Sequence, residues 1–122
     1  MKIWLDTNFL IYAADKKIDY FEEVDNLVKQ GHNFIILSSV IKELERLKKG
    51  NSKPASSSRL ALKILDKNKE NITRIQTDEL PDKFIIENIQ PEDLLASMDR
   101  ELKRKIKNKS ISISKNKKIK IS

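Results

Sequence analysis

The sequence contains no cysteine, which excludes disulfides, zinc-thiolate sites and thiol catalysis. Its only histidine, His32, follows Gly31 where a turn is expected, so we predict a surface turn residue rather than a catalytic base. No apolar stretch approaches the ~20 residues of a membrane span. The start of the chain lacks the long apolar core of a signal peptide. We therefore expect a soluble, cytoplasmic protein with no membrane partner.

Aromatic residues are scarce, at 6% of the sequence, and Trp4 lies in an apolar run that we expect to be buried. Recognition of bases by stacking on aromatic side chains is therefore not expected. Glycine and proline are few, and only residues 50–58 look like a flexible connection. At 122 residues the chain is too short for two separate cores, so residues 1–122 are predicted to form a single domain.

Positive charge is in excess and is concentrated at one end. The formal net charge is +7 and the isoelectric point is near 9.6. Residues 100–122 carry ten Lys and Arg residues and one acid, whereas residues 1–99 have a net charge of −2. A lysine-rich tail is often only a solvated surface. Here it is predicted to be a basic C-terminal segment that binds an anionic partner.

The apolar pattern alternates between short strands and amphipathic helices. Strands are predicted at residues 2–5, 34–37, 72–75, 94–96 and 111–114, and helices at 7–14, 20–30, 40–49, around 61–65, 81–89 and 100–108. This order predicts an α/β fold with three α/β/α layers and a central, mostly parallel sheet of about five strands, the last of them at an edge.

Four acids occur at positions that such a sheet would bring together. Asp6 and Asp99 follow two of the strands, Asp82 lies in the first turn of a helix opened by Pro81, and Glu43 falls beside the apolar stripe of another helix. Strand carboxyl ends and helix amino ends share one edge of a parallel sheet. Oxygen ligands without His or Cys favour Mg²⁺ or Mn²⁺, ions that promote phosphodiester hydrolysis.

Each acid also has a purely structural interpretation. Asp6 and Asp99 fit helix N-caps, Asp82 fits an ordinary first turn, and Glu43 fits a surface ion pair with a neighbouring basic residue. When each acid is considered separately, the sequence does not exclude its structural interpretation. These interpretations do not explain why all four acids should lie at the same edge, so we favour a shared metal site.

Three segments resemble the signature segments of PIN-domain nucleases, in matching order over nearly the whole chain. They are residues 4–10 (Trp-Leu-Asp-Thr-Asn-Phe-Leu), 37–47 (Leu-Ser-Ser-Val-Ile-Lys-Glu-Leu-Glu-Arg-Leu) and 95–105 (Leu-Ala-Ser-Met-Asp-Arg-Glu-Leu-Lys-Arg-Lys). The resemblance is closest to the branch associated with small-subunit ribosomal RNA processing and looser to VapC-type toxins. It implies a PIN-like fold and a nuclease that acts on RNA.

The resemblance also implies roles for single residues. The acids that bind and use the Mg²⁺ or Mn²⁺ would be Asp6, Glu43, Asp82 and Asp99. Asn8 and Ser97 would hold these carboxylates in place. Because metal-bound acids do not retain RNA alone, basic residues after Asp99 are expected to bind its phosphates. These are Arg100, Lys103, Arg104, Lys105 and Lys107.

The sequence departs from the family pattern at two places. Met98 stands where the family has an amide side chain. Asp82 stands between Pro81 and Lys83, where the family usually has an Asp pair or Ala-Asp, and Asp78 and Glu79 lie close enough to compete for its role. We consider three functions. The first is a metal-dependent endoribonuclease that acts in rRNA processing. The alternatives are an inactive PIN-like module that binds RNA or protein, and a VapC-type toxin ribonuclease. A homodimer, and a protein partner such as an antitoxin or ribosome-assembly factor, are left open.

Overall fold

A six-stranded sheet forms the centre of the structure, a computed structural model that describes residues 1–122. Its strands are β1 (Lys2–Leu5), β2 (Asn33–Leu37), β3 (Ile72–Ile75), β4 (Leu94–Ala96), β5 (Ser110–Ile113) and β6 (Ile119–Ile121). Their order across the sheet is β3-β2-β1-β4-β5-β6. Every pair is parallel except β5 with β6, so the mostly parallel sheet is confirmed, with one strand more than expected.

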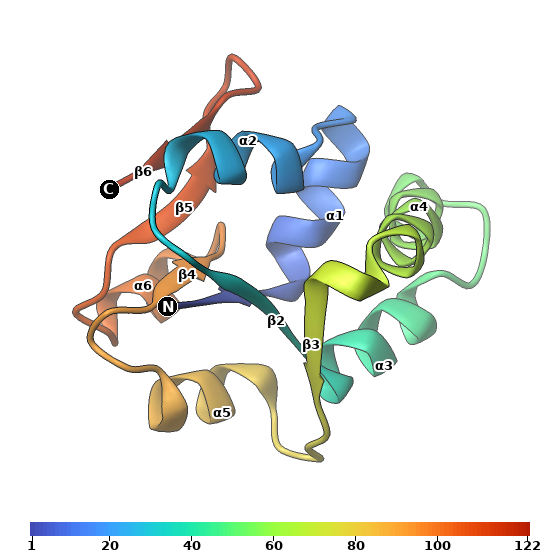
Figure 1. Ribbon diagram of the computed structural model, residues 1–122. Coiled ribbons are helices and arrows are strands. Elements are labelled where there is room, and N and C mark those ends of the chain that lie inside the picture. The colour runs from blue at the N-terminus through green and yellow to red at the C-terminus, as the bar shows by residue number, and fades with distance from the viewer.

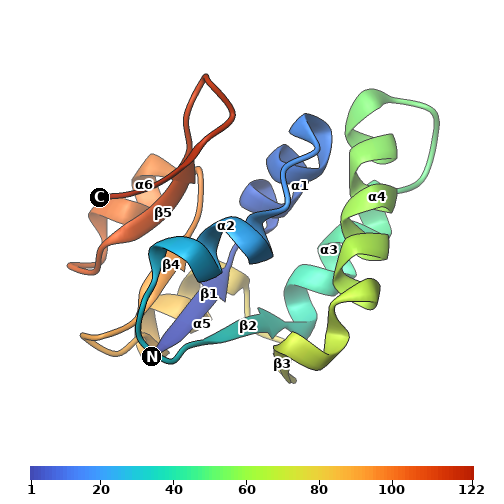
Figure 2. The same ribbon diagram turned by 45° about the horizontal axis from the view of Figure 1, so that its top comes forward.

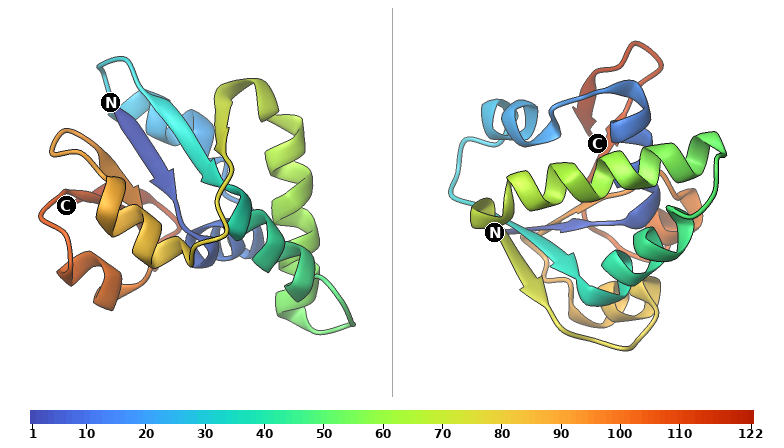
Figure 3. Two further views of the ribbon diagram at one scale, coloured as in Figure 1. Left: turned by 90° about the horizontal axis from the view of Figure 1, so that it is seen from below. Right: turned by 90° about the vertical axis from the view of Figure 1, so that its right-hand side faces the viewer.

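Helices cover both faces of this sheet (Figure 1). They are α1 (Thr7–Lys16), α2 (Tyr20–Leu27), α3 (Ser38–Leu47), α4 (Lys53–Lys67), α5 (Pro81–Asn88) and α6 (Arg100–Arg104), with a short 3-10 turn, η1 (Lys69–Asn71). Phe21 of α2 packs edge-on against Phe34 of β2, with ring centroids 4.8 Å apart. Phe84 of α5 packs against Trp4 of β1, with ring centroids 6.2 Å apart. Helix α5 lies on the face of the sheet opposite α2 (Figure 3). The three-layer α/β/α architecture is therefore confirmed.

Strand β1 runs through the middle of the molecule and is buried on both faces. Ile3, Trp4 and Leu5 are each 2% exposed or less. A strand covered on both faces is expected to be continuously apolar, as this one is. The polar residues that follow it therefore emerge at the carboxyl edge of the sheet, between β2 and β4 on either side.

The buried carboxylate of Asp93 accepts three hydrogen bonds at the opposite, amino-terminal edge of the sheet. Asp93, 3% exposed, accepts hydrogen bonds from the backbone N–H of Lys2 at 2.9 Å and of Gln90 at 3.0 Å. It also accepts one from the Trp4 indole Nε1 at 3.1 Å. Burial raises the pKa of Asp93, but these donors and the Lys2 charge outweigh that effect and lower it overall. Asp93 therefore has a structural role, which the sequence pattern did not indicate.

The stretch at residues 50–58 is not a flexible connection throughout. Helix α4 begins inside it, at Lys53, and the Ser52 hydroxyl caps its first turn, with Pro54 close behind. Ser58, within the helix, donates to the carbonyl of Pro54 at 2.8 Å. The low-complexity composition suggested a loop, but a serine cap followed by proline in the first turn is a helix start signal.

The C-terminal prediction was wrong in two details. Helix α6 ends at Arg104 instead of residue 108, and β5 lies inside the sheet, because β6 forms an antiparallel edge beyond it. Since β5 is parallel to β4, residues 105–109 must carry the chain back to the amino-terminal edge before β5 starts. No helix of the structure combines the length and apolar composition that crossing a membrane requires.

Candidate metal site

Asp6 lies where β1 ends and α1 begins, and it is 5% exposed. Its Oδ1 accepts a hydrogen bond from the backbone N–H of Thr7 at 2.9 Å, so Asp6 is a helix N-cap. Its Oδ2 accepts a hydrogen bond from the Ser97 hydroxyl at 2.7 Å. The two contacts fix the orientation of the carboxylate. The structural interpretation of Asp6 as a cap therefore holds and does not conflict with a role in a shared site.

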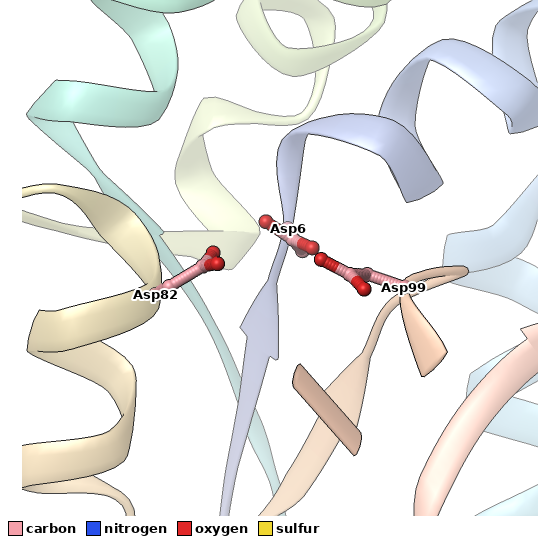
Figure 4. A group of neighbouring side chains, drawn as sticks. All are labelled: Asp6, Asp82 and Asp99. Carbon is pink, nitrogen blue, oxygen red and sulfur yellow. The ribbon is translucent and has the colours of Figure 1, made fainter. Parts of the chain in front are cut away.

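Asp82 and Asp99 converge on Asp6 from two other elements. Asp99 caps α6 by accepting from the backbone N–H of Glu101 at 2.9 Å, and Asp82 lies in the first turn of α5. One carboxylate oxygen from each of the three acids lies within 4.8 Å of the others. Figure 4 shows the three side chains directed toward one another at the end of β1. We call Asp6, Asp82 and Asp99 the aspartate trio.

Glu43 faces the same cavity without joining the aspartate trio. The cavity has a volume of about 330 Å³ and is lined by Asp6, Thr7, Asn8, Glu43, Leu80, Pro81, Asp82 and Asp99. The Thr7 hydroxyl donates to Glu43 Oε2 at 3.3 Å. Glu43 lies more than one turn along α3, away from the sheet edge where the trio gathers. The structure thus brings all four acids to one cavity but only three of them into a close group.

The course of the chain before α5 brings Asp82 to the cavity and leaves Asp78 and Glu79 outside it. Asp78 is 91% exposed and pairs with Lys42 at 3.3 Å, and Glu79 is also exposed. Pro81 then starts α5 and turns Asp82 into the cavity. Neither Asp78 nor Glu79 is among the residues that line it.

Ser38 anchors this segment, a role that sequence reasoning missed. No side chain caps α3, although two serines begin the helix. The buried Ser38 hydroxyl instead donates to the carbonyl of Thr77 at 2.9 Å and accepts from its N–H at 2.8 Å. The only signal in the sequence was a small polar residue at the end of a buried strand. Ser38 thereby ties the helix of Glu43 to the segment that leads to Asp82.

Asn8 and Ser97 hold the site in different ways. The Ser97 hydroxyl donates to Asp6 and accepts from the backbone N–H of Asp99 at 3.0 Å, so it links two of the acids. Asn8 Oδ1 accepts from the backbone N–H of Met98 at 3.1 Å. Asn8 therefore fixes the segment between Ser97 and Asp99 rather than a carboxylate. Because this contact uses the backbone of Met98, the loss of an amide side chain there leaves it intact.

Comparison with known proteins identifies the family. Residues 3–117 match the family described as PIN like domain. The chain belongs to the PIN-like domain family. Ribonuclease VapC4 of Methanocaldococcus jannaschii is 34% identical to this PIN-like domain over 117 residues, 92% of this chain and 87% of that protein. Ribonuclease VapC9 of Archaeoglobus fulgidus is 35% identical over 114 residues, 89% of this chain and 78% of that protein.

Solved structures agree with this assignment. The PIN domain endonuclease Utp24 superimposes on the PIN-like domain with a TM-score of 0.79 and 26% identity, covering 99% of this chain and 90% of that one. VapBC2 from Rickettsia felis, bound to a DNA fragment from its promoter, has a TM-score of 0.57 and 17% identity, covering 92% of this chain and 98% of that one. The latter likeness supports the fold alone.

The electrostatics of the PIN-like domain favour a cation at the aspartate trio. Burial raises the pKa of Asp6 to about 6, an effect that the hydrogen bond from Ser97 opposes and the charge of Asp82 reinforces. Three carboxylates so close together repel one another unless a cation offsets their charge. The ligands are all oxygen atoms, with no histidine or cysteine among them, so the site fits Mg²⁺ or Mn²⁺.

Three of the five predicted RNA-binding residues lie on α6, which starts next to Asp99. Arg100 is the first residue of that helix and is exposed. Lys103 is partly buried, and this burial together with the charges of Lys120 and Arg100 lowers its pKa. Arg104 pairs with Glu101 at 2.8 Å. Of the three, Arg100 is the residue nearest in sequence to the acidic cavity.

Lys107, another of the predicted RNA-binding residues, does not lie beside the acidic cavity. Lys105 is already the C-cap of α6, and Lys107 lines a cavity with Met1 and Asp93 at the amino-terminal edge of the sheet. The cause is the return of the chain between α6 and the parallel strand β5. The basic C-terminal segment is therefore spread over both edges of the sheet.

Proposed function

We propose that this PIN-like domain, acting through residues 1–122 as a single domain, is a metal-dependent endoribonuclease that hydrolyses RNA phosphodiester bonds. The observation that carries the proposal is the aspartate trio, whose oxygens approach within 4.8 Å at the carboxyl edge of a parallel sheet. Two relatives named ribonucleases, each about a third identical over most of the chain, support RNA as the substrate.

The aspartate trio would hold Mg²⁺ or Mn²⁺. Such an ion offsets negative charge that develops on the phosphate and makes bound water more acidic. The remaining residues preserve the arrangement: Ser97 orients Asp6 and Asp99, and Thr7 holds Glu43. Glu43 adds a further carboxylate to the cavity wall, where its other oxygen is available to accept a hydrogen bond from attacking water.

Cleavage of labelled RNA tests this function. Purified protein should cut single-stranded or hairpin RNA with Mn²⁺ and stop when a chelator is added. Asp6→Asn and Asp99→Asn should each lower the rate by at least about a hundredfold, because loss of a group that only supports a metal ligand already costs roughly 10- to 100-fold. Asp78→Asn is the matched control, because Asp78 is 91% exposed and outside the cavity. Full activity in Asp6→Asn would contradict the proposal.

The relatives also favour a specific biological role as a second proposal. Both are named VapC ribonucleases, which supports a VapC-type toxin whose protein partner is an antitoxin. The alternative role in rRNA processing is supported by the motif resemblance and by the likeness to the endonuclease Utp24. Expression of the protein alone distinguishes them: growth arrest that requires Asp6 supports the toxin, whereas unchanged growth contradicts it.

A further inference from the structure

A second cavity, which we call the α1/α4 groove, adjoins the acidic one. It lies where α1 meets the first turn of α4, two helices that pack side by side (Figure 2). Its volume is about 320 Å³, and it is lined by Asn8, Ile11, Tyr12, Asp15, Lys53, Pro54 and Ser57. Asn8 lines both this groove and the acidic cavity. The side chain of Asn8 therefore forms part of the wall of both cavities.

Asn8 presents a free hydrogen-bond donor at the boundary between the two cavities. Its Oδ1 is committed to the backbone N–H of Met98, which identifies this atom as the oxygen of the amide. The Nδ2 group on the other side of the amide makes no hydrogen bond within the protein. An oxygen-rich ligand such as a sugar-phosphate backbone would satisfy this donor.

Tyr12 supplies an aromatic surface in the groove. It is one helical turn beyond Asn8 on α1 and is half-buried, whereas Trp4 and Tyr20 are enclosed in the core. Lys16 Nζ lies 5.6 Å from the centre of its ring. Although aromatic residues are scarce in the sequence, one of them therefore lies in the groove that adjoins the acidic cavity. The four-residue spacing from Asn8 was the sequence signal for this position.

Positive charge borders the groove. The Lys53 side chain is 77% exposed, and its Nζ lies 3.4 Å from Asp15. Lys16 Nζ lies 3.6 Å from the same carboxylate, so one acid is shared by two ammonium groups. The surplus positive charge complements an anionic group such as a phosphate and disfavours a purely apolar partner.

We propose that the α1/α4 groove binds the nucleotide adjacent to the cleaved phosphate. Its base packs on Tyr12, its sugar or phosphate accepts from Asn8 Nδ2, and Lys53 neutralises the next phosphate. The identity of this ligand rests on the proposed ribonuclease function. A nucleotide fits because an aromatic face, an amide donor and exposed ammonium groups occur together in a cavity of about 320 Å³, at the small end of ligand pockets.

Two substitutions test the groove, with a short single-stranded RNA of mixed sequence as the probe. Cleavage with Mn²⁺ gives KM and kcat, and fluorescence anisotropy with chelator gives Kd for the same RNA. Tyr12→Ala should raise both KM and Kd at least about fivefold, the loss expected from one stacked base, with kcat little changed. Tyr12→Phe should match the wild type, because it keeps the ring.

Lys53→Ala and Lys63→Ala are a matched pair, because both lysines lie on α4 and only Lys53 lines the groove. Lys53→Ala should raise Kd and weaken its salt dependence, and Lys63→Ala should change neither. Because the Lys53 side chain is exposed, Lys53→Ala should leave the fold intact. It therefore tests the groove even if Tyr12→Ala impairs folding. Unchanged Kd in Tyr12→Ala and Lys53→Ala would overturn the proposal, as expected if the groove takes a protein segment.

An equal change of Kd in Lys53→Ala and Lys63→Ala would also overturn the proposal, because the lysines would then attract RNA only through their charge and not through the groove. The ribonuclease function and nucleotide binding in the α1/α4 groove can be contradicted by different results. A wild-type protein that binds RNA without cutting it contradicts the ribonuclease function, whereas the anisotropy comparison still decides whether the groove binds RNA.

Discussion

Asp6 stabilises the local backbone and at the same time destabilises the metal-free site. Its carboxylate caps α1 and accepts from Ser97, but burial and the neighbouring aspartates oppose its ionisation. Its pKa of about 6 in the folded protein, above the ordinary 3.8, means that the folded state binds more protons between these values. Stability must therefore fall as pH rises through this window.

Asp6→Asn is expected to stabilise the metal-free protein. The gain in unfolding free energy at pH 7 should reach at most about 3 kcal/mol, at ~1.36 kcal/mol per pKa unit, and should shrink toward pH 4. Urea unfolding at both pH values in the presence of chelator measures it. An Asn variant less stable than the wild type at pH 7 would show that Asp6 acts mainly as a structural cap.

Asp93, at the other edge of the sheet, differs from Asp6 because the effect of burial is outweighed by its hydrogen-bond donors, which stabilise the charged carboxylate and lower its pKa. Asp93→Ala would leave the N–H donors of Lys2, Trp4 and Gln90 without their acceptor. We expect a loss of about 2–4 kcal/mol in unfolding free energy, because unsatisfied buried donors are costly. Glu92→Ala, at an exposed neighbour, is the control in the same urea experiment. Equal stability of the two variants would refute this role.

At the scale of elements, the connection between β3 and α5 leads to Asp82 and is held by Ser38. Ser38 holds Thr77 through two hydrogen bonds, and Asp82 follows five residues later. Ser39, its neighbour, has a buried hydroxyl with no hydrogen-bond partner. Two adjacent serines thus differ in what their hydroxyl groups contribute.

Ser38→Ala should lower the unfolding free energy by about 1–3 kcal/mol and weaken Mn²⁺ binding, because Asp82 loses its anchor. Ser39→Ala should change stability by no more than about 0.5 kcal/mol. Thermal unfolding and metal titration of both variants provide the comparison. If Ser38→Ala binds Mn²⁺ like the wild type, the anchor does not control the position of Asp82.

The sequence predicted elements best where the chain is buried on both sides. The apolar runs of β1, β2 and β4 indicated strands, and their polar ends indicated where Asp6 and Asp99 would lie. Strand β6 was missed because it has only two apolar residues, which Lys120 separates and Lys117 and Lys118 precede. The contacts of Ser38, Thr7 and Asn8 join segments distant in sequence, so no local pattern predicts them.

At the scale of the whole molecule, we expect the proposed RNA binding to depend more on where each basic residue lies than on the net charge of +7. Arg100 lies next to Asp99 at the carboxyl edge, whereas Lys107 lies at the opposite edge with Asp93. Residues that neutralise phosphates at the site must be on its own side of the sheet. Substitutions at Arg100 and Lys107 can therefore be compared to separate the effect of position from that of overall charge.

Arg100→Ala should weaken RNA binding and reduce the slope of log K against log salt by about 0.7, the value for one phosphate contact with a single strand. Lys107→Ala removes the same charge and should leave both quantities near the wild-type values. Anisotropy titrations over a range of salt concentrations measure them. Equal losses in both variants would show that only overall charge matters.

Calorimetric titration with Mn²⁺ tests the metal site at the aspartate trio most directly. The wild type and Asp78→Asn should bind Mn²⁺ alike, since Asp78 is exposed and pairs only with Lys42. Asp6→Asn, which keeps the shape of the side chain, should bind at least about tenfold more weakly. Absence of binding by the wild type at millimolar Mn²⁺, or equal binding by Asp6→Asn, would contradict a metal site at the aspartate trio.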